Sequence, residues 1–158
     1  YEGTTAIQSN ALVGRSVLRD KGASIAGFLD RIAATATAAS AVAATATLGP
    51  RLAAAVESTR AAVAWLVEAA AEDARLPFAA SVPFLMLMGS LTGGQAMVEA
   101  AMAADRAIAA GEDHDGWYAA RIALADAYCG QTLPRAEAEW QILRQSSAAV
   151  LAVDPAHL

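Results

Sequence analysis

The chain begins with YEGTTAIQ, in which one carboxylate precedes a glycine and two threonine hydroxyls: Glu2, Gly3, Thr4 and Thr5. A carboxylate can remove a weakly acidic proton from carbon only where a water-poor site raises its pKa and holds the substrate against it. A residue at a chain end has neither, so in this chain alone we expect Glu2 to be an ordinary solvated carboxylate. An alternative is that Glu2 and Thr4 only stabilise a helix N-terminus.

Other residue clusters are interpreted as structural features. The acidic run Glu112–Asp115 is expected to be a solvated loop rather than a cation site, because it lacks the spacing of known metal motifs. The glycines of Gly89–Gly94 follow no strand and precede no lysine, so they indicate close helix packing rather than a phosphate loop. Cys129 is expected to be a small core residue, and the four methionines Met86, Met88, Met97 and Met102 to be core filler.

The opening stretch YEGTTAIQSNALVGR resembles the C-terminal motif of the acyl-CoA dehydrogenases. This resemblance implies that Glu2 is the catalytic base that removes the α-proton of an acyl-CoA thioester, while FAD accepts the β-hydride. It further implies that Gly3 lies against the substrate and that Thr4 and Thr5 contact the flavin. The chain would then be part of a longer enzyme, and we expect the isolated chain neither to retain FAD nor to be active.

The rest of the chain resembles the helical domain appended to one subgroup of that family, typified by the 3-methylmercaptopropionyl-CoA dehydrogenases. The stretches that carry this resemblance are AWLVEAAAED, SVPFLMLMGSLTGGQAM and ARIALADAYCGQTLPRA. It implies a division into residues 1–22, the end of the catalytic domain, and residues 23–158, the appended bundle. The implied partners are an acyl-CoA substrate, an electron-transfer acceptor, the dehydrogenase body and a second copy in a homo-oligomer.

Helical periodicity in every long segment predicts an all-α fold, an antiparallel bundle of about five to six helices. We expect helices over about 5–19, 24–47, 51–74 and 81–110, a fifth from about 115 through Tyr128, and a last one over about 134–154, with LGP at Leu48–Pro50 ending the second. On the third, Leu52, Val56 and Val63 share a core-facing stripe, and on the last, Ala136, Trp140, Leu143 and Val150 share one face. The first half of the fourth is expected to be central.

Composition narrows the function classes. The 158 residues are 56% apolar and 17% charged, with a net charge of −5 and scattered arginines, which makes a nucleic-acid partner improbable. One cysteine and no signal-peptide pattern favour a reducing cytoplasmic location. Two uncharged stretches, Ile32–Pro50 and Leu76–Val98, are long enough to cross a membrane. We expect buried helices instead, because the first has few large apolar residues and the second contains prolines and glycines.

Two alternatives to a dehydrogenase part stay open at this point: a non-catalytic helical interaction module and a small membrane protein built on Leu76–Val98. We also expect residues 1–22 to be displaced or frayed in the isolated chain. Trp65 lies about 200° around its helix from the apolar stripe, which predicts a docking surface there rather than a place in the bundle core.

Overall fold

The computed structural model describes residues 3–154 and residue 156. Its α-helices are α1 (Thr5–Leu12), α2 (Ala23–Ser40), α3 (Leu48–Glu72), α4 (Leu76–Ala79), α5 (Ser81–Ala109), α6 (Trp117–Gln131) and α7 (Pro134–Ala152). Shorter turns of π and 3₁₀ helix are η1 (Val13–Val17), η2 (Leu18–Asp20) and η3 (Ala43–Thr45). No strand occurs within this described part, and the predicted all-α class is confirmed.

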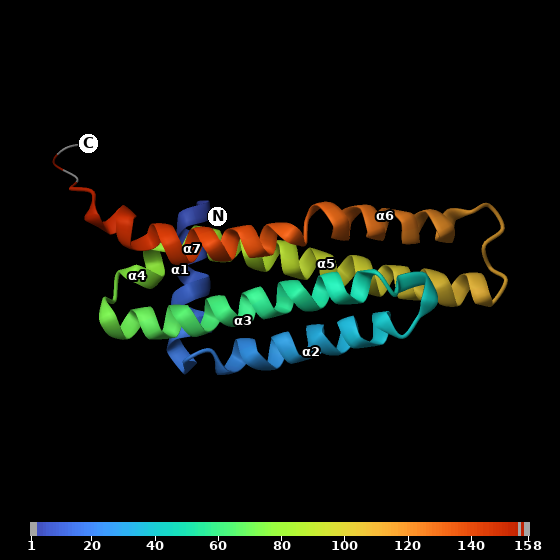
Figure 1. Ribbon diagram of the computed structural model, residues 1–158, viewed down its shortest axis with the longest axis horizontal. Helices are drawn as coiled ribbons and strands as arrows, with labels where there is room; N and C mark the ends of the chain where they lie inside the picture. The colour runs from blue at the N-terminus through green and yellow to red at the C-terminus, as the bar shows by residue number, and fades with distance from the viewer. Residues whose placement is uncertain (1–2, 155, 157–158) are drawn as a thin grey trace.

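The long helices form an antiparallel bundle (Figure 1). Helices α2, α3 and α5 alternate in direction, and α7 and α6 return along α5 one beyond the other, α7 against its first half and α6 against its second. Helix α1 crosses the bundle steeply near one end and packs against α5. Helix α5 therefore touches helices on several sides, as predicted for its apolar first half.

The core follows the apolar stripes of the sequence. Fully buried side chains include Phe84, Leu87 and Leu91 from α5, and Leu52 and Val56 from α3. Burying a side chain of this size stabilises the fold by about 1.5–3 kcal/mol. The predicted stripe of α3 is thus confirmed.

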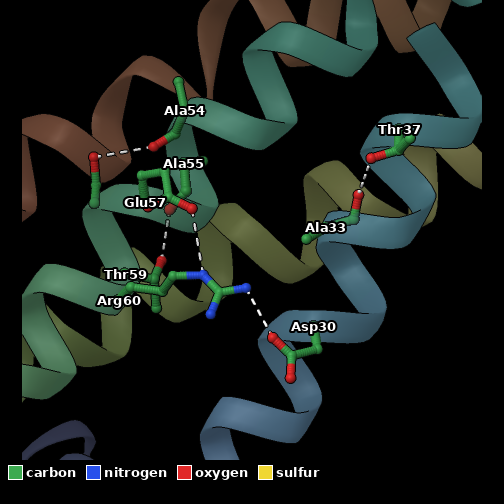
Figure 2. A network of polar contacts seen from close by, with 9 residues as sticks. Asp30, Ala33, Thr37, Ala54, Ala55, Glu57, Thr59 and Arg60 are labelled. Carbon is green, nitrogen blue, oxygen red and sulfur yellow. Dashed lines mark hydrogen bonds and ion pairs between the residues drawn. The ribbon is translucent and has the colours of Figure 1, made fainter.

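Polar contacts hold α2 and α3 in register at the bundle surface (Figure 2). The Arg60 guanidinium lies between two carboxylates, with its Nη2 2.9 Å from Asp30 Oδ1 on α2 and its Nε 3.3 Å from Glu57 Oε1 on α3. Because both carboxylates are largely exposed and Arg60 is partly exposed, the pairs contribute about 0–1 kcal/mol each and act mainly on register.

The predicted end of the second helix is wrong. Helix α2 stops at Ser40, and the chain then turns through η3, where the buried Thr45 hydroxyl donates to the carbonyl of Ala39 at 2.9 Å. Leu48–Pro50 begins α3 instead of ending α2. Proline is tolerated there because the first backbone N–H groups of a helix have no intrahelical acceptor.

The N-terminal segment is not displaced, which corrects our expectation for its described residues. Helix α1 continues through η1 and η2, and Val13 and Val17 are fully buried in the common core. The segment ends at Lys21 and Gly22, which both adopt positive φ, 55° and 84°. Helix α2 then begins at Ala23, one residue before its expected start, and Ser24 donates hydrogen bonds from both its backbone N–H and its hydroxyl to Asp20.

Three predicted side-chain positions also need correction. Trp65 is half-buried and packs against the core cluster, so it is not a free docking anchor. Val150 is 57% exposed, and Ser147 takes the buried position on that face of α7. Met86 is 43% exposed, whereas the other three methionines pack against the core.

The stretch that could have been read as a membrane span is part of the bundle. None of the helices in the described residues has the length and hydropathy needed to cross a bilayer. Leu76–Val98 instead forms α4 and most of α5.

Candidate functional site

The residues of the opening motif lie at the N-terminus of α1. Thr4 has an extended backbone, and its carbonyl accepts the first helical hydrogen bond from the Gln8 N–H at 3.0 Å. Thr4 and Thr5 are exposed, and the Thr4 side chain makes no capping hydrogen bond. Glu2 lies outside the described residues. The motif therefore presents its two hydroxyls at an exposed helix end.

Gly3 is half-buried against its own helix. A Cβ atom at this position would lie 3.0 Å from Gln8 Nε2 and 3.2 Å from Ile7 Cγ2. Both neighbours are side chains of α1, so no other helix requires a glycine here. The absence of a side chain at Gly3 lets Gln8 and Ile7 pack against the backbone at the start of α1.

A polar cluster of Ser9, Asn10 and Ser81 joins α1 to α5, and the sequence analysis did not identify it. The Oγ atoms of Ser9 and Ser81 lie 3.0 Å apart, and the Ser81 hydroxyl donates to Asn10 Oδ1 at 2.8 Å. Ser9 also donates to the Ala6 carbonyl at 2.9 Å. Ser9 and Ser81 are fully or nearly fully buried, so their hydrogen bonds are shielded from water.

The polar cluster and the buried residues that follow it position the opening motif relative to the bundle. Ser9 is followed at intervals of four residues by Val13 and Val17, and all three are buried on the same side of the helical segment. This four-residue spacing is the feature of the sequence from which the buried side of the N-terminal segment could have been predicted. Ser9 lies only one turn beyond Thr5, so the exposed helix end is directly followed by residues packed in the bundle.

A second concave feature lies between α3 and α7. It is an open groove of about 590 Å³ with an alanine-rich floor, and Ser58, Glu137 and Trp140 are among its lining residues. Glu137 accepts hydrogen bonds from Gln141 Nε2 and from the Ser58 hydroxyl, each at 2.7 Å. These bonds, that from Gln141 foremost, lower the pKa of the Glu137 carboxyl below its ordinary value.

Glu137→Gln is expected to lower the free energy of unfolding at pH 7 by about 0.5 kcal/mol, a value reduced for solvent screening because Glu137 is exposed. A lowered folded-state pKa stabilises the fold above the unfolded-state value of about 4.5, and this stabilisation is lost as the pH falls through the folded-state pKa. The difference between wild type and variant should thus disappear at low pH. Urea unfolding at a series of pH values measures it.

Glu139 on the same helix supplies a control of opposite sign, since burial raises the pKa of its carboxyl. Glu139→Gln removes a charge that is penalised by desolvation, so this variant is expected to be slightly more stable than wild type at pH 7. That gain should also vanish at low pH. A loss of similar size in both variants at pH 7 would contradict the assigned pKa directions.

The acidic loop before α6 is engaged in capping that helix. Asp113 accepts backbone hydrogen bonds from Tyr118 at 2.9 Å and Ala119 at 3.3 Å, and Asp115 accepts one from Trp117 at 3.1 Å. These bonds satisfy N–H groups that lack intrahelical acceptors. Over the described ranges, no group of three acidic, histidine or cysteine side chains is placed to hold a metal ion.

Two further sequence interpretations are confirmed. Cys129 is fully buried, and burial raises the pKa of its thiol, which disfavours the reactive thiolate. Gly93 and Gly94 allow close packing, because a Cβ at the first would collide with the Tyr128 hydroxyl and one at the second with Leu133. At Gly89 a Cβ would meet no atom within 4 Å, so this glycine is not required by packing.

Comparisons with known proteins give the chain a family. The model of a family described as "Acetyl-CoA dehydrogenase C-terminal like" matches residues 28–154. A curated 3-methylmercaptopropionyl-CoA dehydrogenase of Ruegeria pomeroyi is 41% identical over 140 residues, which are 88% of this chain and 24% of that protein. The broad-specificity linear acyl-CoA dehydrogenase FadE5 of Mycobacterium tuberculosis is 28% identical over 164 residues, covering 99% of this chain and 27% of that protein. The chain thus spans about a quarter of the length of the curated relatives it matches.

Proposed function

Because the chain belongs to the acetyl-CoA dehydrogenase C-terminal-like family, we propose that it is the C-terminal part of a longer, FAD-dependent acyl-CoA dehydrogenase. The observation that carries the proposal is the 41% identity to a 3-methylmercaptopropionyl-CoA dehydrogenase over 88% of the chain. The reaction would be α,β-dehydrogenation of an acyl-CoA thioester. The acyl-CoA is the substrate, and a separate electron-transfer protein is the final acceptor.

In this proposal the opening motif contributes part of the active site. Glu2 takes the α-proton of the thioester on its carboxylate, and Gly3 leaves room for the substrate beside it. When bound, FAD supplies the acceptor for the β-hydride. Thr4 and Thr5 would contact the flavin, and their exposure at the end of α1 is compatible with this role. The remaining cofactor contacts would come from the rest of the longer protein.

The division into two parts is also a proposal. Residues 1–22 would be the last helix of the catalytic domain, and residues 23–158 the appended bundle. The family match from residue 28 supports a boundary near this point. The burial of Val13 and Val17 means that the two parts would share one core, so the bundle would brace the helix that carries the motif. We propose a structural, docking or oligomerisation role for the bundle, in an enzyme that we propose to be cytoplasmic.

The test is to purify the longer protein and this chain side by side. We expect the longer protein to carry flavin, visible in its absorbance spectrum, and to reduce an electron acceptor when supplied with acyl-CoA thioesters. The chain alone should do neither, because it spans about a quarter of such an enzyme. A longer protein that binds no flavin and oxidises no acyl-CoA would refute the proposal and favour a non-catalytic interaction module.

A further inference from the structure

An uncharged strip runs along the outer side of α4 and the beginning of α5. It consists of Phe78 on α4 and of Val82, Met86 and Gly89 on α5, and the spacings of four and three residues place the last three on one side of α5. The side chains of Phe78, Val82 and Met86 are 41%, 38% and 43% exposed. No charged residue occurs between Arg75 and Glu99. The solvated face of a helix is ordinarily charged or polar. An exposed strip without charges therefore has the character of a contact surface.

The strip borders the N-terminal segment, which comprises α1, η1 and η2. A Cβ at Gly14 would lie 3.6 Å from the Phe78 ring, so this side of the N-terminal segment borders the strip. Ile7, two helical turns before Gly14 and 61% exposed, adds an apolar side chain to the α1 side. Helix α1 itself carries no charged residue. The uncharged surface therefore involves α1, α4 and α5 at one end of the bundle.

The exposed Trp117 has a different setting. Trp117 on α6 is 52% exposed, but the Arg121 guanidinium lies over its ring at 4.6 Å. Arginine stems and guanidinium groups cover aromatic rings in this way on solvated surfaces. The surface of α6 at Trp117 thus combines an apolar ring with a charged group, whereas the strip has no charged group.

We propose that the strip is the docking surface for the part of the longer protein that precedes this chain. The inference rests on the proposed function in one respect, that such a preceding part exists. The matched relatives have about three quarters of their length outside the shared region. The preceding part would join before α1, which contacts the first residue of α5 through Ser9 and Asn10.

This occupant is favoured over a second copy of the chain by the cost of association. A tethered neighbour is held at high effective concentration, so a narrow apolar strip is sufficient to dock it. A second copy loses translational and rotational freedom and generally requires about 800 Å² of buried surface per partner. The three apolar side chains of the strip suit the tethered neighbour better.

Cysteine labelling tests the proposal. Met86→Cys and Val82→Cys place a thiol on the strip, and Leu124→Cys is the matched control, since Leu124 on α6 is 49% exposed. Cys129 is fully buried and should give little background. Maleimide modification at each site is followed by peptide-resolved mass spectrometry in this chain and in the longer protein.

We expect both strip thiols to react about tenfold or more slowly in the longer protein than in the chain, which corresponds to an opening free energy of about 1.4 kcal/mol. The Leu124→Cys thiol should react equally in both. Equal rates at the strip in the two forms would overturn the proposal. So would a dimer of the chain alone, detected by sedimentation, that Met86→Glu abolishes while Leu124→Glu does not.

Failure of this inference is distinguishable from failure of the proposed function. Flavin content and acyl-CoA oxidation are measured on the same wild-type longer protein. A protected strip without acyl-CoA oxidation would refute only the enzyme assignment, whereas oxidation with a freely reactive strip would refute only the docking surface.

Discussion

In the longer protein, Glu2→Gln is expected to lower the turnover of acyl-CoA by about 10²- to 10⁴-fold and to leave the flavin content unchanged. The amide retains the size of the carboxylate but cannot accept a proton at neutral pH. Binding contacts made elsewhere should persist, so the loss should appear in kcat more than in KM. Steady-state kinetics with an artificial electron acceptor and the flavin-to-protein absorbance ratio measure both quantities.

Glu68→Gln is the control, because Glu68 is exposed on α3 and has no proposed role in the reaction. It removes the same charge and should leave turnover unchanged. Glu2→Asp keeps a carboxylate but moves it back by one methylene, so intermediate turnover is expected. Near-normal turnover of Glu2→Gln would assign the base to another residue and remove the catalytic role proposed for the opening motif.

Much of the fold could be predicted because the long helices are each amphipathic or uniformly apolar over several turns. The stripe of Leu52, Val56 and Val63 identified the buried side of α3, and the uncharged start of α5 identified the central helix. These patterns depend only on the period of the helix and on the hydrophobic effect, so no knowledge of the partner helices was needed.

The errors arose where neighbouring helices decide the outcome. Helix α3 packs against α2 on one side and α5 and α7 on others, so its buried arc is wider than the apolar stripe and reaches Ser58 and Thr59. This wide contact surface is why Trp65, outside the stripe, still packs against the core. The break after Ser40 was missed for a related reason: alanine and threonine fit a helix or a turn, and the buried Thr45 bond to Ala39 decides between them.

The candidate site was predicted from its motif and not from its supports. Glu2, Gly3, Thr4 and Thr5 were identified by resemblance to a family, and their proposed roles still await the kinetic test. The contact between Ser9 and Ser81 joins residues 72 positions apart. Isolated serines give no signal of such a pairing, because the same residue type is equally common on solvated surfaces.

Gly49→Ala is expected to lower the free energy of unfolding of this chain by about 1–3 kcal/mol, the usual cost of overfilling a packed interior. Gly49 is buried in the first turn of α3, against the last turn of α2. A Cβ there would collide with the Ser40 hydroxyl and would lie 2.5 Å from the Ala36 carbonyl oxygen and 2.8 Å from the Ser40 nitrogen. Two of these atoms are backbone, so relief requires the helices to separate. Urea unfolding followed by circular dichroism measures the loss.

Gly27→Ala is the matched control on the neighbouring helix. A Cβ at Gly27 meets no atom within 4 Å, so alanine should stabilise α2 by about 0.5–1 kcal/mol through its higher helix propensity. Adding Ser40→Ala to Gly49→Ala removes the hydroxyl but not the two backbone contacts, and it also removes the Ser40 hydrogen bond to Ala36. The double variant should therefore stay clearly less stable than Ser40→Ala alone. If Gly49→Ala were as stabilising as Gly27→Ala, this result would contradict the close approach of α2 and α3 at Gly49.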